Sequence, residues 1–590
     1  MKGNYTTACL LCILCIVMGC RKEKLDVFFD RKNILNSPAS TIRIYNFTNG
    51  LLNVSVNNIQ LTNFIEAKDV RAAPSTGTEM GLAFFPKGVW PSGKNGSPLT
   101  LPATLLDKYS RARIYIVPGY DKDNTSPIIP GLAVDTVLQD DPLHPVDYFL
   151  LSDGHFRAIP RSVAVPVAPD HFKIRILNLG AANDPLRLSG PVTMTYADGA
   201  PVHDVLNGVG IGMVSEYIEV PYGSYQFKLF VDNNHQKQLC ELPVSPYIDV
   251  CTQKILPQTK IFPFVRTFKP GGTYSVIVTQ NTFIYDGCGP EDIVYESINS
   301  YRIVEENNPP LNTSYARVMG ANALADQSIL FKLDGKEMGI FRETGKATDP
   351  QIVITGKHTL AAFDNSGNLL AEKSCNFSAA DFYTAWVYDK GGKPDLIFTS
   401  NNMAISHYVK DPPGDDGTDG DKNITKYDYA WQSRFLNLSE DIPYATFTNQ
   451  DGENFEFTRG GGGIYQDVVN PRTSYQNMEP GQIVMHEPSV IAPYTNNNRT
   501  TNKTGSVGFS YMPSLIRVFQ STPGPLGQTP GNWLSAIAPL RSQDFIANPG
   551  LYETGLPAAE SGAYSIALIG RLKGGSGKQK ARLIFVKHNK

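Results

Sequence analysis

Residues 175–179 read Arg-Ile-Leu-Asn-Leu, and this short stretch decides the fold because the chain repeats it. The same order of an arginine, two apolar residues, an asparagine and a further apolar residue occurs at 43–47 and 434–438, with a weaker copy at 317–321. The copies lie roughly one domain length apart, much farther than the period of a solenoid repeat. The chain is therefore predicted to contain four related modules.

Each copy is followed by the signals of further strands. A second alternating segment tends to end in a pair of residues that tolerate the positive φ of a tight hairpin. Later in each copy a strand-like run carries a tyrosine. The turn pairs are Asn57-Asn58, Asp198-Gly199, Asp334-Gly335 and Asp451-Gly452, and the tyrosines are Tyr148, Tyr274, Tyr383 and Tyr564.

Composition agrees with many short strands. The 51 Gly and 42 Pro residues disfavour long helices, and aromatic residues at 10% are too many for a disordered chain. We therefore expect an all-β protein made of tandem immunoglobulin-like antiparallel β-sandwich modules, with little helix.

The opening strand with its Arg and Asn, the Asp-Gly turn, a Gly-x-Tyr strand at 223–225 and the tyrosine-bearing strand together resemble the DUF4397 family. Members of that family are immunoglobulin-like modules of secreted and lipid-anchored bacterial proteins, commonly in Bacteroidetes. The resemblance covers most of the chain and is best in the second and third copies. It implies no catalytic residues, because the family has none established.

Proline-bearing junctions suggest the module limits. Module 1 is predicted at 40–166, module 2 at 170–305, module 3 at 313–410 and module 4, with a long insertion, at 424–590. Residues 411–423 are predicted to form an acidic Gly/Pro linker. Because such linkers act as semi-rigid spacers, the modules are expected to form a row of separate bodies.

The amino-terminal residues predict export and lipidation. Lys2 and the apolar run 8–18 have the length and order of a signal peptide, predicted at 1–19. Gly19-Cys20 after an aliphatic residue resembles the lipobox of bacterial lipoproteins, in which the cysteine is acylated (a palmitate-type modification). Residues 20–39 then form a lipid-anchored linker, and the protein is expected in the cell envelope, anchored to the outer membrane on its periplasmic or its exposed face. The alternative is an ordinary secretory signal in which Cys20 is incidental.

Charge and cysteine spacing exclude some classes of partner. A net charge of −3 gives no electrostatic footprint for nucleic acid. The mature cysteines lack the spacing of a zinc site, and no cofactor motif is present. In an oxidising compartment, Cys240 and Cys251 are candidates for a local disulfide, with Cys288 as an alternative partner.

Two sets of residues are candidates for binding. Asp415, Asp419 and Asp421 are a weak candidate calcium site, and the alternative is a solvated linker. The aromatic side chains of the two long insertions are candidate ligand contacts, and the alternative is that they cap the sandwich ends. These aromatic candidates are Phe85, Trp90, Tyr475 and Tyr494.

The sequence favours a non-catalytic, lipid-anchored scaffold, adhesion or ligand-binding stalk, whose partner is a glycan or an envelope or extracellular protein. One alternative is an outer-membrane glycan-capture protein that works beside a transporter. The second is an unrecognised hydrolase, since carboxylate pairs meet in space and not in sequence. No G-x-S-x-G nucleophile motif is present.

Overall fold

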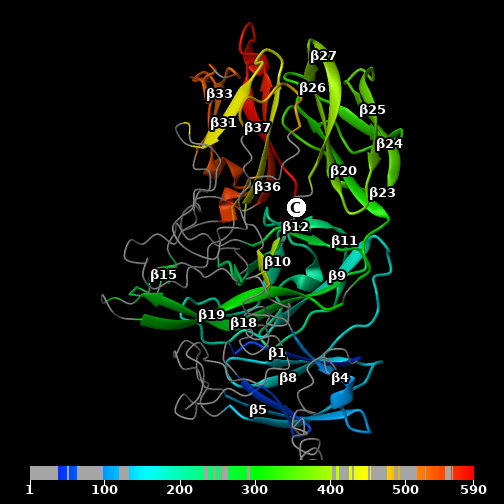
Figure 1. Cartoon of the computed structure of the whole chain (residues 1–590), viewed down its shortest axis with the longest axis vertical. Helices are drawn as coiled ribbons and strands as arrows, with labels where there is room; N and C mark the ends of the chain where they lie inside the picture. Colours follow the sequence, from blue (N-terminus) through cyan, green and yellow to red (C-terminus); the bar gives the residue numbers. More distant parts are fainter. Residues whose placement is uncertain are drawn as a thin grey trace, which may run out of the picture. The chain divides into compact units, whose positions relative to one another are not determined.

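The computed structural model of the chain is drawn in Figure 1. The residues that it describes are 38–48, 52–62, 98–118, 132–231, 237–242, 248–249, 251–252, 254–255, 263–286, 288, 293–307, 309–401, 407–410, 424–427, 431–449, 452, 475–483, 489–491, 515–524, 526–551, 560 and 562–590.

The fold is all-β and sandwich-like, which confirms the predicted fold class. Helical structure within the described ranges is limited to 3₁₀ turns such as η3 (Ala103–Leu105) and η4 (Asp204–Leu206). None of these turns has the length and apolar character of a membrane-crossing helix.

One sheet recurs in all four modules with the same strand order. The strand that carries the repeated motif lies in its interior, between an antiparallel edge strand and the tyrosine-bearing strand, and the last strand of the module follows. In module 1 the order is β4 (Leu99–Pro102), β1 (Ala39–Asn46), β7 (Val146–Leu150), β8 (Phe156–Pro160); in module 2 it is β11 (Ile218–Pro221), β9 (His171–Asn178), β18 (Thr273–Asp286), β19 (Ile293–Glu305), β14 (Cys240–Glu241); in module 3 it is β23 (Gln351–Ile354), β20 (Tyr315–Asn322), β26 (Phe382–Lys390), β27 (Lys393–Ser400); in module 4 it is β32 (Ser489–Ile491), β30 (Trp431–Ser439), β36 (Gly562–Gly570), β37 (Arg582–Lys587).

The facing strands vary more between modules. Modules 1 and 3 have regular four-stranded sheets, whereas module 2 has short pairs. The facing strands are β3 (Ile59–Thr62), β2 (Leu52–Val56), β5 (Arg111–Pro118) and β6 (Val134–Gln139) in module 1; the pairs β10 (Thr193–Thr195) with β13 (Lys228–Phe230), β12 (Gly223–Tyr225) with β17 (Arg266–Phe268), and β15 (Ile248–Asp249) with β16 (Lys254–Ile255) in module 2; β22 (Lys336–Glu337), β21 (Leu330–Leu333), β24 (Gly356–Phe363) and β25 (Leu369–Phe377) in module 3; and β31 (Ala445–Asn449), β33 (Leu515–Gln520), β34 (Asn532–Trp533) and β35 (Leu540–Arg541) in module 4. A further hairpin pairs β28 (His407–Lys410) with β29 (Ile424–Tyr427).

The sandwiches are not purely antiparallel. In every module the first strand pairs in parallel with the tyrosine-bearing strand, as β9 does with β18 and β20 with β26. The last strand then runs back antiparallel to that strand. Since Tyr315 begins β20 and Ser400, which ends β27, lies opposite Tyr383, the chain enters and leaves module 3 at the same end. The registers of the other modules give the same result.

The chain divides into two compact units. One contains Met1–Val163 and Pro412–Asn423, and the other contains Ala164–Asp411 and Ile424–Lys590. Module 1 therefore stands as a unit of its own, and modules 2, 3 and 4 belong together. The expectation of a row of separate modules is wrong for these three, because they pack against one another through extensive side-chain contacts.

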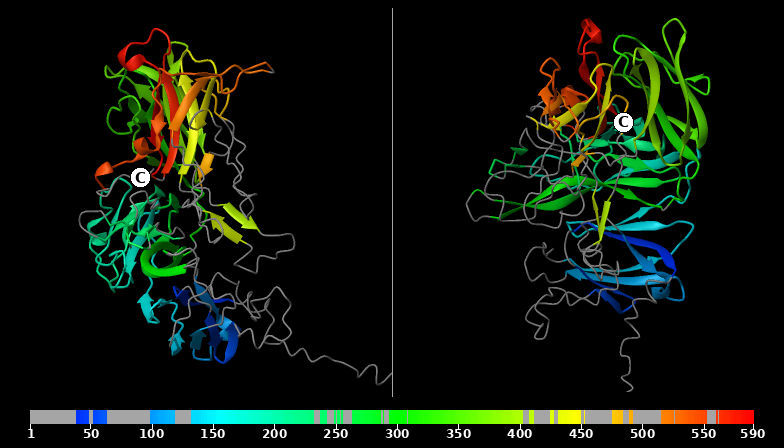
Figure 2. Two further views of the ribbon diagram at one scale, coloured as in Figure 1. Left: turned by 90° about the vertical axis from the view of Figure 1, so that its left-hand side faces the viewer. Right: turned by 45° about the horizontal axis from the view of Figure 1, so that its top comes forward.

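Modules 3 and 4 share a hydrophobic core, which we call the shared core. Their main sheets each bury two faces, one in the core of the module and one against the other module, and both views in Figure 2 show the yellow-to-red strands of module 4 beside the green strands of module 3. Residues of the shared core from module 3 are Met319, Ala321, Ala323, Phe382, Trp386, Tyr388 and Ile397, and those from module 4 are Leu436, Leu438, Ala567, Ile569 and Val586.

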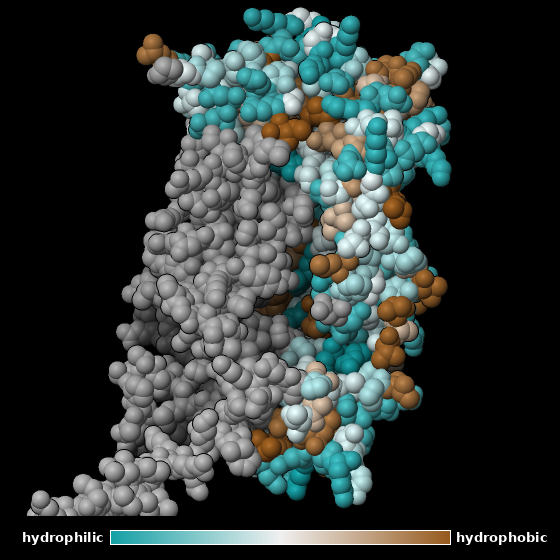
Figure 3. All heavy atoms as spheres, turned by 45° about the vertical axis from the view of Figure 1, so that its right-hand side comes forward, coloured by the Kyte–Doolittle hydropathy of each residue, from teal (hydrophilic) through white to brown (hydrophobic). Residues whose placement is uncertain are grey.

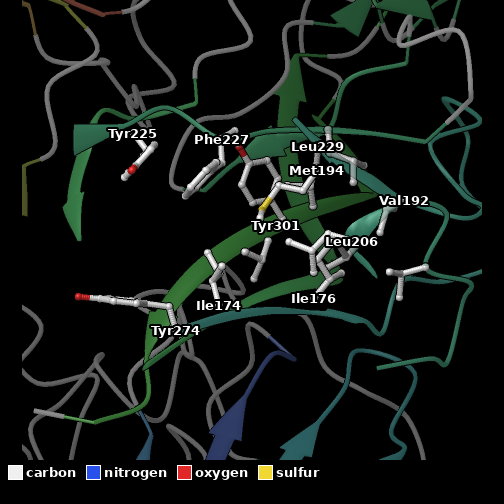
Figure 4. Packing of buried hydrophobic residues seen from close by; sticks show 14 of the residues in the cluster. Ile174, Ile176, Val192, Met194, Leu206, Tyr225, Phe227, Leu229, Tyr274 and Tyr301 are labelled. Atoms are coloured by element: carbon white, nitrogen blue, oxygen red, sulfur yellow. Dashed lines mark hydrogen bonds between the residues drawn. The ribbon is translucent and has the colours of Figure 1, made fainter. Parts of the chain in front are cut away.

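Module 2 has its own core and also contacts modules 3 and 4. In Figure 4 aliphatic side chains such as Ile174 and Ile176 face aromatic rings such as Phe227 across the sandwich. The Arg317 guanidinium of module 3 lies 5.5 Å from the ring of Tyr222 and donates to Ser224 Oγ at 2.8 Å. Modules 2 and 3 are therefore joined by a buried cation that packs on an aromatic ring.

The repeated asparagine serves the fold. In module 2, Asn178 Nδ2 donates to the carbonyls of Gly190 and Val209, both at 2.9 Å, so the side chain fastens two loops beyond the end of β9. Asn322 and Asn437 make the same kind of paired donation, and all three are almost fully buried. Because a buried amide needs its hydrogen bonds satisfied, the position tolerates few other residues.

The repeated arginine is less uniform than the sequence pattern indicated. Arg175 lies three residues before Asn178, whereas Arg317 lies five residues before Asn322, so the two arginines occupy different rungs of their strands. The true register follows the asparagine: Asn322 lies opposite Val387, as Asn178 lies opposite Val278. A shift of two residues keeps the arginine on the same face of the strand. The alternating sequence pattern is therefore the same in both registers and did not reveal the shift.

We predict that Gly320→Ala destabilises module 3. A Cβ atom at Gly320, in the middle of β20, would collide with the ring of the fully buried Phe331. Overpacking of this kind costs about 1–3 kcal/mol, measurable as a lower denaturant midpoint of the full chain. Gly210→Ala is the control, since its Cβ would meet only Met213 at 3.5 Å; equal stability losses for both variants would contradict the prediction.

Candidate functional site

Most of the residues predicted from the sequence to carry function lie outside the described residues. This holds for the signal peptide 1–19 and for the lipidation residue, the calcium candidates and three of the aromatic candidates. They are Cys20, Phe85, Trp90, Asp415, Asp419, Asp421 and Tyr494. Among the described residues no group of three or more His, Cys, Asp or Glu side chains is placed to hold a metal ion.

The prediction that Tyr475 is an exposed ligand contact is wrong. Its side chain belongs to the core of module 4, with 3% of its surface exposed. The ring packs edge-on against Phe435 with centroids 4.7 Å apart, and its hydroxyl donates to the Ser433 carbonyl at 3.3 Å. The ring therefore fills the sandwich, which is closer to the alternative considered above.

The predicted Cys240–Cys251 disulfide is also wrong. Cys251 pairs with Cys288, the alternative partner, while Cys240 is a buried free thiol on β14 whose burial raises its pKa. Cys240 is buried on β14, whereas Cys251 and Cys288 are exposed and lie between the strands of two hairpins, β15–β16 and β18–β19. The disulfide therefore links the two hairpins near their tips.

A serine and a histidine lie in hydrogen-bond contact where modules 3 and 4 meet. His588 Nε2 is 2.7 Å from Ser565 Oγ, and His588 Nδ1 is 3.4 Å from Thr384 Oγ1. Such a pair has the composition of a nucleophile and its base. Ser565 is fully buried, however, and His588 is only 3% exposed, so the pair lies inside the interface and a substrate has no access to it. Its role is structural.

We predict that His588 makes the joined modules sensitive to acid. Burial, together with the nearby Arg434 and Arg317 guanidinium groups, lowers the pKa of His588 from 6.5 to about 3. The unfolded chain therefore takes up the proton first. The stability that the neutral imidazole supports is complete above pH 6.5 and falls by about 1.4 kcal/mol per pH unit as the pH drops from 6.5 towards 3. Urea unfolding of the native chain and of His588→Gln across this window measures the difference.

His358 is the control, because its contribution to stability depends on pH in the opposite direction. Burial alone would lower its pKa, but its contacts with the Asp334 carboxylate (2.6 Å) and the Ile354 carbonyl (2.7 Å) raise it overall. Its contribution is therefore present below pH 6.5 and is lost as the pH rises through the folded pKa. A His588→Gln variant that keeps the acid sensitivity of the native chain would contradict the assignment.

The most distinctive described surface is a long hairpin in module 2. Strands β18 and β19 pair continuously from Tyr274 opposite Glu305 to Asp286 opposite Ile293, far longer than an ordinary strand pair. The parallel neighbour β9 accompanies β18 only as far as Val278. The two strands therefore extend beyond β9, and Figure 1 shows them projecting as a green arm.

One side of this hairpin is polar and ends in an aromatic ring. Residues opposite one another in an antiparallel pair share a face, so Thr282 and Ser297 lie side by side, with their hydroxyls 3.0 Å apart. Tyr295 lies one rung farther out on the same face and is 47% exposed. Gln280, one rung farther in, donates to the Asn183 carbonyl at 3.4 Å.

A loop beside this face forms a shallow depression. Its lining comes from residues 182–189 and Lys237, around an open volume of about 520 Å³. Asp184 organises the loop: one carboxylate oxygen accepts from the Leu186 and Leu188 amides, and the other accepts from the Asn299 amide of β19 at 2.6 Å. The depression is thus fixed to the hairpin.

We call this combined surface the hairpin face. It brings together amide, hydroxyl, cationic and aromatic groups on a rigid support. The sequence analysis missed it, because it treated the strand of Tyr274 like those of the other modules, did not identify β19, and found no motif in the loop. Figure 3 shows exposed apolar residues in separate small groups among polar ones in the view that it draws. The hairpin face is defined by Asn183, Arg187, Ser189, Lys237, Gln280, Thr282, Tyr295 and Ser297.

Comparisons with known proteins add little. No family model and no curated protein matches the chain. Among solved structures, a leucine-rich repeat protein from Bacteroides thetaiotaomicron VPI-5482 is similar over 38% of this chain and 26% of its own, with 9% sequence identity and a TM-score of 0.10. At that TM-score the likeness supports no inference about fold or function.

Proposed function

We propose that the protein is a non-catalytic, lipid-anchored component of the cell envelope that binds a ligand on rigid immunoglobulin-like modules. The observation that carries the proposal is the hairpin face: a stapled two-stranded arm of polar and aromatic groups on a body of three interlocked modules. Loops and hairpins on a rigid scaffold are the usual place for recognition. The DUF4397-type resemblance supports the same proposal.

The use of the repeated polar residues supports binding over catalysis. Arg43 pairs with Asp147 through two hydrogen bonds at 2.8 and 2.6 Å, and Arg175 pairs with Glu306 at 3.0 Å. These arginines, like the buried asparagines, stabilise the modules. The polar side chains that recur between modules therefore have structural roles, which supports a binding protein over an enzyme.

Anchoring is tested by mass spectrometry of the protein from its own cells. We expect the mature amino terminus at Cys20, carrying acyl chains, and release of a Cys20→Ser variant from the membrane fraction, since stable attachment needs at least two acyl chains and the variant carries none. An unmodified Cys20 in a membrane-free protein would contradict the anchor. Protease treatment of intact cells then distinguishes the exposed face of the outer membrane from the periplasmic one.

A further inference from the structure

The hairpin face has an order that suits an extended ligand. Along β19, the rung of Asn299 lies under the 182–189 loop and Tyr295 lies four residues farther out. At about 3.3 Å per residue the depression and the tyrosine ring are roughly 13 Å apart, with the Thr282 and Ser297 hydroxyls between them. A ligand that contacts all three parts must be extended over this distance, as several linked rings would be, because a single small molecule would reach only one part.

The backbone of Arg187, at the edge of the depression, adopts a conformation that is unfavourable for a non-glycine residue. Its φ is +57°, in the left-handed region that non-glycine residues seldom adopt. The conformation is imposed by the Asp184 turn, in which the Arg187 amide donates to the Asp184 carbonyl at 3.0 Å while Leu188 is buried. Within the described part of the chain the Arg187 guanidinium forms no ion pair and is exposed. Arg187 therefore holds a cation at the edge of the depression, where an anionic group of a ligand can reach it.

The chemistry of these groups selects a class of ligand. An exposed tyrosine ring stacks on the apolar face of a sugar ring, and neighbouring hydroxyl and amide groups match sugar hydroxyls. A guanidinium binds a carboxylate through two parallel hydrogen bonds. We propose that the hairpin face binds an acidic oligosaccharide, with Tyr295 stacking on one sugar ring and Arg187 pairing with a carboxylate on another. This inference rests on the proposed function and gives its ligand class.

The test is a printed array of oligosaccharides probed with the purified, detergent-solubilised mature chain. The array carries oligouronates, their methyl esters, and neutral oligosaccharides of the same length. We expect retention on the oligouronates and loss on the methyl esters, which keep the rings and lose the charge. Retention should also weaken as salt rises, because exposed charges are screened within about 10 Å at 0.1 M.

Matched variants assign the contacts. Tyr295→Thr keeps a strand-forming residue and removes the ring, and Arg187→Asn keeps a residue that tolerates positive φ and removes the cation. Each is expected to weaken binding at least tenfold. Tyr115→Thr in module 1 removes a ring that is also 47% exposed on a strand, and Arg157→Asn removes an exposed cation of the same module; both should bind as the native chain does.

Two outcomes overturn the inference: no retention of the native chain on any acidic oligosaccharide, or retention that Tyr295→Thr and Arg187→Asn leave unchanged while circular dichroism shows native folding. Equal retention on the methyl esters contradicts the role of Arg187. These results are separate from the anchoring test, because the array uses solubilised protein. A negative array with an acylated Cys20 defeats the ligand class alone.

Discussion

Replacing Trp386 by alanine is expected to lower the free energy of unfolding of the joined modules 3 and 4 by about 3–5 kcal/mol. The side chain is fully buried in the shared core, and its Nε1 donates to Thr399 Oγ1 at 3.1 Å. Its removal leaves a large cavity between two sheets that cannot close together without moving a whole module. Thermal or urea unfolding of the full chain measures the loss.

A double-mutant cycle shows whether the core is truly shared. Leu436 and Leu568 are both fully buried in module 4, but Leu436 belongs to the shared core and Leu568 to the core of module 4 itself. Trp386→Ala combined with Leu436→Ala should deviate from additivity by about 1 kcal/mol or more, and combined with Leu568→Ala it should be additive. Additivity in both pairs would mean that modules 3 and 4 merely touch.

Glu560→Gln is expected to destabilise the junction of modules 2 and 4 by about 3 kcal/mol or more. The Glu560 carboxylate lies 3.0 Å from Lys587 Nζ and 3.5 Å from Lys228 Nζ. Although burial would raise the pKa of Glu560, the two ammonium groups lower it overall, while burial lowers the pKa of Lys228 to about 8. Neutralising the carboxylate leaves these two cations without their shared counter-charge in a poorly hydrated site.

Two further variants separate this explanation from a general packing defect. Lys228→Met in the Glu560→Gln background should recover part of the loss, because it removes the more deeply buried cation. Glu440→Gln is the matched control: its ion pair with Arg571 is partly exposed, so its loss should cost less than about 1 kcal/mol. A Glu560→Gln chain as stable as the native one would show that the charges are well hydrated after all.

The sequence predicted the all-β fold and many of its strands well because the residues that specify them are local. The motif strands, the Asp334-Gly335 turn with φ values of +48° and +80°, and the tyrosine-bearing strands all form where the patterns placed them. These features depend on neighbours within a few residues, so a single sequence contains them. The parallel pairing of first and penultimate strands was not visible, because it joins residues about one hundred positions apart, such as Arg175 and Ser275.

The sequence of module 3 contains a sign of its contact with module 4, which the sequence analysis did not use. The sequence predicts an alternating strand at 383–387, yet all five residues are buried, as are Phe382 and Tyr388 on either side. Ala385 and Val387 face the core of module 3, while Trp386 and Tyr388 face the shared core. A strand without a polar face is typical of a sheet covered on both sides, and this run therefore indicated a second packing partner.

The candidate site was hardly predictable. Tyr475 was chosen because it lies in a long aromatic-rich insertion, but insertions also supply rings to a core. Tyr295 and Arg187, more than one hundred residues apart, lie on one surface because several hydrogen bonds join the loop to the hairpin. The Asn299 amide donates to Asp184, and Gln280 donates to the Asn183 carbonyl. No spacing rule connects a loop to a hairpin through such bonds.

The common end at which the chain enters and leaves each module determines how a module answers a pull. Tension between its two termini would strip the final strand from its neighbour one rung at a time, as a zipper opens, and would never load all the rungs together. Such a module resists traction poorly, however stable it is at rest. We therefore expect each module to bear little mechanical load between its two ends.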